Sequence, residues 1–246
     1  LDRGPSLRLT LDGNQNDFAA WAPDGEAVMF HSDKAGPSWD IWSKLADGSG
    51  QAALLLDLGE AVMQSQWSPN GEWLIYDYTA DGGANILAVR PDAATPPVPL
   101  ATSVSRETGF ALSSDGRWLA YTGNETGTYE IYVLPFPDAA AAKWAVSPGG
   151  GAEPTWSGDG RELFYRNRNG DMVGVPVETE ATFTAAPPSV LFSALRYRAN
   201  VNHRQYDVTP DAQRFIMLRP VSDVGSDWIL VLNFVEELRA LNDSAP

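Results

Sequence analysis

The sequence predicts an all-β fold, a β-propeller built from four-stranded antiparallel blades. Two observations carry this prediction: a ten-residue phrase recurs five times, and further short apolar segments follow each copy. The phrases are WAPDGEAVMF from Trp21, WSPNGEWLIY from Trp67, LSSDGRWLAY from Leu112, WSGDGRELFY from Trp156 and VTPDAQRFIM from Val208. They start 46, 45, 44 and 52 residues apart. Chance does not explain five copies at a near-constant period, and a period of about 45 residues is typical of propeller blades.

Each phrase predicts a tight turn followed by a strand. An apolar anchor precedes a small residue, usually Pro, then Asp or Asn, and usually Gly. Pro presets the backbone for a turn, Asp or Asn bonds its own main chain, and Gly takes a positive φ. Because they recur in every copy, the polar residues of this motif are interpreted as turn formers rather than catalytic groups: Asp24, Asn70, Asp115, Asp159 and Asp211. The anchors Trp21, Trp67 and Trp156 are predicted to fill the space between neighbouring sheets.

Two more strands are expected in each repeat. An acidic or amide residue opens an apolar third strand at Asp40, Asn85, Glu130, Asp171 and Asp227. A weaker fourth strand is expected near 52–57, 98–102, 143–147 and 189–193. Four strands in each period fit one blade, whereas a helical repeat would show apolar residues at a spacing of three to four.

The fifth repeat lacks a fourth strand of its own. The segment SLRLTL at 6–11 resembles the fourth strands, so it is predicted to pair with the last blade and to close the ring without a free sheet edge. Residues 1–246 are expected to form a single propeller domain, either a five-bladed ring or part of a six-bladed one. Phe234, Leu238 and Leu241 lie at helical spacing and predict a short terminal helix at about 233–241.

At these phrases the sequence resembles TolB-like propeller repeats, relatives of the WD repeats, over nearly the whole chain. The second half is most similar to the C-terminal propeller of bacterial serine/threonine protein kinases and related sensor proteins. The segments that carry this similarity are YEIYVLPFPD at 129–138, KWAVSPGGGAEPTWSGDGRELFYR at 143–166, YDVTPDAQRFIMLRP at 206–220 and VLNFVEEL at 231–238. The resemblance implies a sensory or scaffolding module and an extracytoplasmic, periplasmic setting. Kinase motifs are missing from this sequence, and family members usually carry six phrases rather than five.

Composition excludes several classes of function. The 246 residues include 32 acidic and 17 basic side chains, a formal charge of −15. Nucleic-acid binding is disfavoured because Lys and Arg hold the phosphate backbone. Cysteine is absent, which excludes disulfides, thiolate zinc sites and cysteine nucleophiles. No apolar stretch is long enough to predict insertion of this segment into a membrane.

The candidate site is a central funnel. In a propeller the first strand of each blade lines the channel, so residues just before each anchor are expected to converge at one mouth. The side chains predicted there are Asp17, Gln64, Glu107, Glu153, His203 and Arg204. Carboxylates, an amide and an imidazole suit a hard cation, a sugar or a cationic peptide end. A solvated channel that holds only ordered water is the alternative. No cofactor is expected, although a bound Ca²⁺ or other cation stays open, and His31 is interpreted as an exposed loop histidine.

The expected function is a non-catalytic module, not an enzyme, that binds a protein or peptide partner or a small neutral or cationic ligand. No Walker loop, nucleophile elbow or zinc-peptidase motif is present. The alternative is an enzyme: a glycan-active hydrolase that uses two of Asp17, Glu107 and Glu153, or a propeller that accompanies a peptidase.

Overall fold

The computed structural model describes residues 7–37, 39–57, 59, 62–80, 83–91, 95–103, 105–220 and 226–230. Strands β1 to β20 make up the regular structure of this part of the chain. Two compact units are formed: unit 1 ends at Pro99 and unit 2 begins at Leu100. No helix among the described residues has the length and apolar character needed to cross a membrane.

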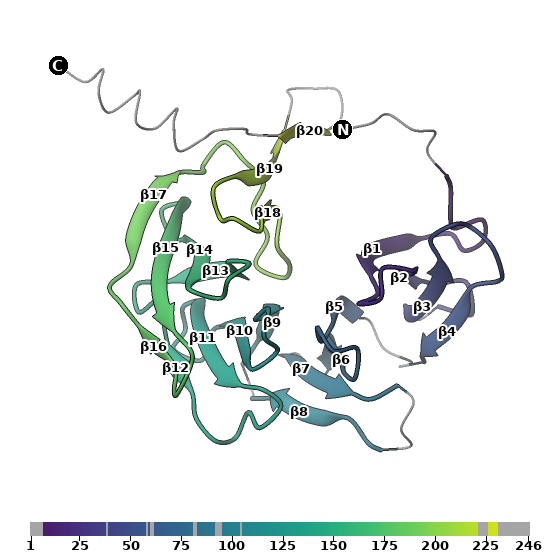
Figure 1. Ribbon diagram of the computed structural model, residues 1–246, viewed down its shortest axis with the longest axis horizontal. Helices are drawn as coiled ribbons and strands as arrows, with labels where there is room; N and C mark the ends of the chain where they lie inside the picture. Colours follow the sequence, from purple (N-terminus) through teal and green to yellow (C-terminus); the bar gives the residue numbers. More distant parts are fainter. Residues whose placement is uncertain are drawn as a thin grey trace. The chain divides into compact units, whose positions relative to one another are not determined.

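Unit 1 contains two antiparallel sheets, in the orders β1-β2-β3-β4 and β5-β6-β7-β8 (Figure 1). The last strand, β8, runs two residues past the unit boundary. The strands of the first sheet are β1 (Asn16–Trp21), β2 (Ala27–Ser32), β3 (Asp40–Leu45) and β4 (Ala53–Leu56). Those of the second are β5 (Val62–Trp67), β6 (Leu74–Ala80), β7 (Gly83–Val89) and β8 (Val98–Ala101). Apolar side chains such as Met29, Ile41 and Leu74 form the core of this unit.

Unit 2 contains three antiparallel sheets. Their strand orders are β9-β10-β11-β12, then β13-β14-β15 with β16 and β17 both paired to β15, then β18-β19-β20. Bounds of the first sheet are β9 (Glu107–Leu112), β10 (Trp118–Gly123), β11 (Glu130–Pro135) and β12 (Trp144–Ala145). The second has β13 (Gly151–Trp156), β14 (Glu162–Asn167), β15 (Asp171–Glu178), β16 (Thr184–Ala185) and β17 (Ser189–Ser193). The third has β18 (Tyr206–Val208), β19 (Phe215–Pro220) and β20 (Ser226–Leu230).

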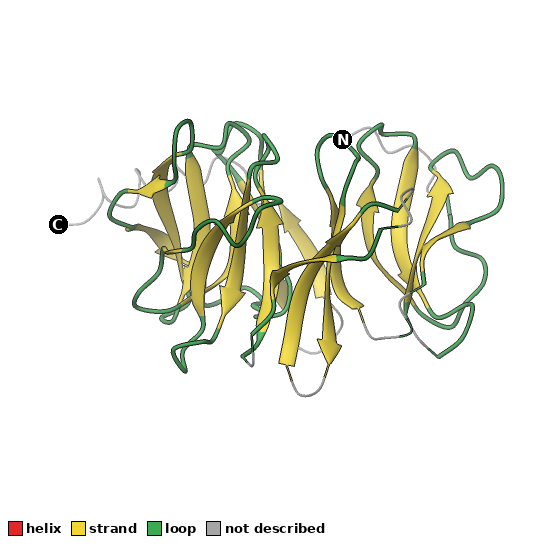
Figure 2. Cartoon of the chain, turned by 90° about the horizontal axis from the view of Figure 1, so that it is seen from below, coloured by secondary structure: helices red, strands yellow, loops and turns green. Residues whose placement is uncertain are grey.

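Apolar layers join the sheets of unit 2 face to face. Trp118, Trp156 and Phe183 pack between the first and second sheets. Phe164, Phe192 and Phe215 pack between the second and third. In each sheet, loops join the strands at both ends of the sheet (Figure 2). Loops that are far apart in the sequence can therefore lie at the same end of a sheet.

The predicted turns are confirmed in detail. Ser113 Oγ donates to Asp115 Oδ1 at 2.6 Å and accepts from Trp118 N at 3.0 Å. The same pattern recurs after Trp67, with Ser68 and Asn70, and after Trp156, with Ser157 and Asp159. These carboxyl and amide groups are therefore bound to their own turns.

The three tryptophan anchors differ in burial. Trp156 is 6% exposed and its Nε1 donates to Ala111 O of the preceding sheet at 3.0 Å, as predicted for a core residue. Trp67 packs against the core of unit 1. Trp21 is 63% exposed, so its prediction as a core residue is wrong. The reason is local: unit 1 has two sheets, and each covers only one face of the other.

Four-stranded antiparallel sheets confirm the predicted fold class. The closing strand expected at 6–11 is not formed by residues 7–11, which lie in no strand, while Ser6 is outside the described residues. Leu7 instead packs over the turn at Gly48 of unit 1. The helix expected at about 233–241 also falls outside the described residues. The single domain over 1–246 stays a prediction.

Candidate functional site

In four of the five sheets, the first strand is irregular within the four residues before the anchor. Its register with the second strand shifts there in β1, β5, β9 and β13. Phe18, Gly109 and Glu153 take left-handed backbone conformations, with φ of 53°, 56° and 62°. Such a bulge turns a side chain away from the regular alternation. A left-handed conformation costs a non-glycine residue roughly 1 kcal/mol or more, so Glu153 is held there by its surroundings.

Glu153 and Arg166 form a buried ion pair on neighbouring strands. Arg166 Nε donates to Glu153 Oε2 at 3.0 Å, and the side chains are 6% and 1% exposed, respectively. Burial raises the pKa of Glu153 above its ordinary value, and the Arg166 guanidinium offsets part of that rise. Removing either partner would leave an uncompensated charge in the interior.

The ion pair holds the long segment 194–205 that joins β17 to β18. Arg166 donates to the carbonyl oxygens of Ala194 and Arg198, both at 2.9 Å. Glu153 Oε1 accepts from the backbone N of Asn200 at 2.5 Å. Apart from the bond between the two side chains, the hydrogen bonds named here fix one loop.

The same segment also contacts β9. Thr108 Oγ1 donates to Asn202 O at 3.1 Å, and Arg106 donates to the Asn202 side chain at 3.2 Å. A Cβ at Gly109 would lie 2.7 Å from Val201 O, so only glycine allows this approach. The longest repeat interval, 52 residues, thus contains a loop that folds over the first strands of two sheets.

An open pocket of about 500 Å³ is lined in part by this loop, and we call it the unit 2 pocket. Its walls come from the β10–β11 turn, the start of β13, the β14–β15 turn and the 194–205 segment. The lining residues are 127–129, 151–153, 166–168, 170, 195 and 199–201. The volume suits a small organic ligand or a short peptide.

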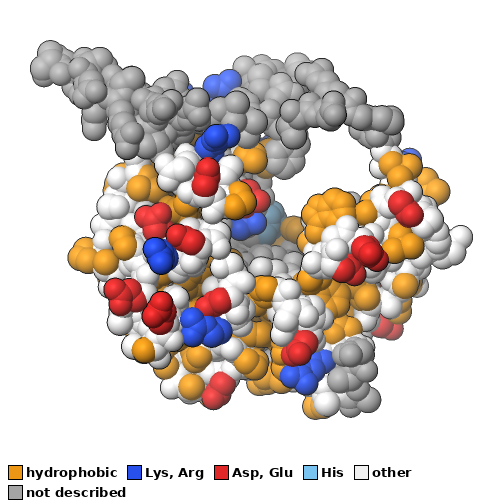
Figure 3. Space-filling model, in the orientation of Figure 1, with side chains coloured by type: hydrophobic (Ala, Val, Ile, Leu, Met, Phe, Trp, Pro, Cys, Tyr) orange, Lys and Arg blue, Asp and Glu red, His pale blue; other side chains and the backbone are white. Residues whose placement is uncertain are grey.

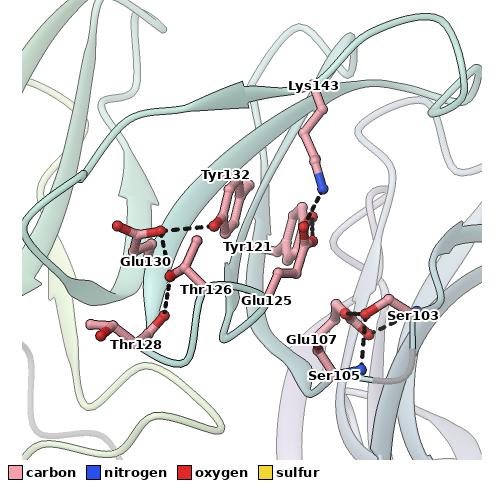
Figure 4. Close-up of polar contacts among 10 residues, drawn as sticks. All are labelled: Ser103, Ser105, Glu107, Tyr121, Glu125, Thr126, Thr128, Glu130, Tyr132 and Lys143. Atoms are coloured by element: carbon pink, nitrogen blue, oxygen red, sulfur yellow. Dashed lines mark hydrogen bonds and ion pairs between the residues drawn. The ribbon is translucent and has the colours of Figure 1, made fainter.

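The predicted funnel residues are placed as follows. Glu153 lines the pocket, His203 lies 3.3 Å from the Asn200 amide, and Arg204 reaches Thr155 and Asp207. Glu107 is buried and bound by Ser103 (Figure 4). Asp17 and Gln64 belong to unit 1, where Asp17 is exposed and the Gln64 N–H donates to Asp77 Oδ1. Of the six residues, Glu153 thus bonds the 194–205 segment, and His203 and Arg204 belong to that segment.

A second polar cluster, around two stacked tyrosines, is internally satisfied (Figure 4). Tyr121 donates to Glu125, and Tyr132 donates to Glu130 at 2.8 Å. Lys143 pairs with Glu125 and lies 5.1 Å from the centre of the Tyr132 ring. Burial raises the pKa of Tyr132 to about 12. Each of these charges already has a partner, so the cluster stabilises the first sheet of unit 2.

His31 is buried in β2, so its interpretation as an exposed loop histidine is wrong. Its ring is fully buried, and Nε2 lies 2.7 Å from Ser65 Oγ of the second sheet. Nδ1 has no hydrogen-bond partner among the described residues. A serine nucleophile needs access to substrate and a base that a third group orients. Ser65 is 8% exposed, so this pair is assigned a structural role.

The unit 2 pocket does not contain the pair of carboxyl groups that glycoside hydrolysis requires. No group of three or more His, Asp or Glu side chains there is placed to hold a metal ion. Glycoside hydrolysis requires two carboxyl groups that flank the substrate. Glu153 is the carboxylate that lines the unit 2 pocket, and its carboxyl group is paired with Arg166.

Known proteins share the fold of this chain. TolB from Acinetobacter baumannii superposes with a TM-score of 0.64 at 14% identity, over 88% of this chain and 52% of that one. The periplasmic gluconolactonase PpgL of Pseudomonas aeruginosa matches with a TM-score of 0.53 at 14% identity, over 90% and 74%. The chain therefore has a TolB-like β-propeller fold, and its repeats are consistent with five blades. The closer resemblance to kinase propellers stays a prediction.

Two matches are to peptidases. The uncharacterized peptidase YuxL of Bacillus subtilis is 24% identical over 53% of this chain and 26% of its own length. A puromycin-hydrolyzing peptidase of Mycobacterium tuberculosis superposes with a TM-score of 0.56 at 15% identity, over 88% of this chain and 36% of that one. The chain thus spans about a quarter of the length of the curated relative. No family model matches this sequence.

These peptidase matches correct one prediction. The sequence was expected to be that of a protein without enzymatic activity, because it contains no catalytic motif. The sequence similarity to YuxL and the fold shared with the puromycin-hydrolyzing peptidase contradict that expectation.

Proposed function

We propose that this chain is the substrate-recognition propeller of a peptidase-type enzyme and that it binds a peptide in the unit 2 pocket. The observation that carries the proposal is the pocket itself, a cavity of about 500 Å³ whose loop wall is fixed by the Glu153–Arg166 pair. A preorganised wall lowers the entropic cost of binding. The sequence similarity to a peptidase supports a peptide as the ligand.

The pocket has the mixed character that peptide binding requires. Leu195, Ala199 and Val201 supply an apolar wall, while Asn167, Arg168 and Asn200 supply polar groups. Leu195 is 74% exposed at the rim, where a ligand side chain can cover it. Predominantly apolar pockets with a few placed polar groups are the usual form of small-ligand sites.

Blocking the pocket tests this proposal. Ala199 is exposed and lines the pocket, so Ala199→Trp is expected to fill part of the cavity and to weaken binding of a short peptide at least tenfold. Ala186→Trp, at an exposed position outside the pocket, is the matched control and should bind as the parent chain does. Isothermal titration with a short capped peptide measures both. Unchanged affinity in Ala199→Trp would place the peptide elsewhere.

We also propose an extracytoplasmic location. The resemblance to TolB-like propellers supports it, as does the fold shared with a periplasmic gluconolactonase. Fractionation of cells that express the full-length protein from its natural gene tests this point. Recovery in the cytoplasmic fraction alone would contradict it.

A further inference from the structure

The unit 2 pocket carries one positive charge that nothing in the described part of the chain compensates. Three side chains that are charged at neutral pH line it: Glu153, Arg166 and Arg168. Glu153 and Arg166 neutralise each other. Arg168 is exposed and makes no hydrogen bond or ion pair with any described residue. On the face drawn in Figure 3 the acidic and basic side chains of unit 2 are interspersed, so local charge rather than the total of −15 decides what the pocket attracts.

The aliphatic stem of Arg168 lies against the backbone. A Cβ on Gly150 would lie 2.3 Å from both Cγ and Cδ of Arg168. The aliphatic part of Arg168 therefore lies directly on the backbone of Gly150, and no other residue type leaves this space. Gly150 has a φ of 101°, which side chains rarely adopt. The stem of Arg168 thus packs on Gly150, while its guanidinium bonds no described residue.

Apolar side chains line the pocket near the β14–β15 turn, which contains Arg168. A Cβ on Gly170 would lie 2.5 Å from Cδ2 of Leu195, so Leu195 packs over the β14–β15 turn that also carries Arg168. Ala199 and Val201 continue the same wall. A ligand that satisfies both features has a planar anion next to an apolar group.

We propose that the unit 2 pocket binds the C-terminal carboxylate of a peptide whose last side chain is apolar, with Arg168 as the carboxylate partner. This inference rests on the proposed function and names the end of the peptide that the pocket selects. Arginine matches a carboxylate with two parallel N–H donors, a geometry that an amide end does not reproduce. A peptide α-carboxyl is fully ionised at neutral pH.

The test compares two probes that differ only at one end: acetyl-Ala-Leu with a free carboxylate, and acetyl-Ala-Leu amide. Isothermal titration at pH 7 with this chain is expected to show binding of the carboxylate roughly tenfold or more tighter than that of the amide, as for a hydrogen bond to a charged group. In Arg168→Gln the two probes should bind equally, at the level of the amide. Arg168→Lys should keep part of the preference.

Controls separate the possible results. Arg161→Gln removes an exposed arginine outside the pocket, on the same sheet, and should keep the full preference. Acetate alone should bind at least tenfold more weakly than the carboxylate peptide, because it lacks the apolar group. Acetate that binds equally well would overturn the peptide part of the proposal.

The two proposals fail in distinguishable ways. If both peptides bind equally to the parent chain and Ala199→Trp abolishes binding, peptide recognition stands and the carboxylate preference is wrong. A preference that survives in Arg168→Gln would also overturn the role of Arg168. If neither peptide binds at millimolar concentration, both proposals are wrong.

Discussion

At the scale of single residues, His31 shows how burial converts a titratable side chain into a stability determinant. Desolvation lowers the pKa of His31 from its ordinary value of 6.5 to about 4. Between these two values the unfolded chain binds a proton that the folded chain does not. The free energy of unfolding must therefore fall as the pH is lowered from 6.5 to 4, and it is unaffected by this group above that window.

His31→Gln should remove this acid-dependent loss. The amide can still bond Ser65 but does not titrate, so the variant is expected to lose up to about 3 kcal/mol less stability between pH 6.5 and 4 than the parent chain. Urea unfolding at a series of pH values measures the difference. His203→Gln, which alters the other histidine, should retain most of the slope; an unchanged slope in His31→Gln would contradict the assignment.

Arg166 provides a second prediction at this scale. Arg166→Met removes the partner of a carboxylate that is 1% exposed and frees the carbonyl groups of the 194–205 segment. The expected cost is about 3–5 kcal/mol of unfolding free energy. Glu153→Gln combined with Arg166→Met should cost less than Arg166→Met alone, because no charge is left buried. Chemical denaturation measures both, and an equal or larger cost in the double variant would refute the pairing.

Sequence reasoning identified some of these residues and not their partners. The position of Glu153 in the sequence, shortly before the Trp156 anchor, predicts it as a site residue, and it lines the pocket. Arg166 was missed because its pairing depends on the register of β13 against β14, which shifts at the bulge. Arg168 is not predicted from the sequence, because its stem packs where Gly150 lacks a side chain. A single sequence does not reveal that contact.

At the scale of elements, the turn that joins the first two strands of each sheet is the most regular feature of the fold. Gly25, Gly71, Gly116 and Gly160 take φ between 71° and 73° in the first four copies. The fifth copy has Ala212 at the same place, with φ of 58°. The fold thus forces an alanine into a conformation that its Cβ disfavours.

Ala212→Gly should therefore stabilise the third sheet of unit 2. Glycine removes the backbone strain of the left-handed alanine, and this effect outweighs the conformational entropy that glycine adds to the unfolded chain. We therefore expect the free energy of unfolding to rise by about 0.5–1 kcal/mol. The reverse change at a matched turn, Gly116→Ala, should cost about 1 kcal/mol or more. Thermal unfolding measures both. Ala212 also packs against the core between the second and third sheets, so a destabilised Ala212→Gly would show that this contact outweighs the relief of backbone strain.

The sequence predicts the strands correctly where the ten-residue phrase recurs, and less well in segments outside the phrase. The turn phrases and the strands after them are confirmed because their local chemistry recurs in each copy. The segment 7–11 is not a strand, although its alternating apolar residues resemble one. Leu7 and Leu11 are 60% and 75% exposed, so no sheet buries them. Alternation alone therefore does not determine whether a segment pairs.

At the scale of the whole molecule, total charge is a poor guide to the ligand. The excess of acidic residues predicted a neutral or cationic ligand. In the structure several acidic groups are bound in turns or ion pairs, as Asp115 is with Arg117 and Glu125 is with Lys143. The charge that remains open in the unit 2 pocket is positive. Fold class, in contrast, was predictable from the repeat period, because it depends on pattern rather than on individual contacts.

Amide hydrogen exchange with bound peptide tests the central claim, that the unit 2 pocket is the recognition site. Acetyl-Ala-Leu at saturating concentration should slow exchange in residues 127–129 and 195–201, which line the pocket, and leave β1 to β7 of unit 1 unchanged. Ligand contact and a more rigid loop both give protection there. Slower exchange in other segments, with residues 195–201 unaffected by the peptide, would contradict the account.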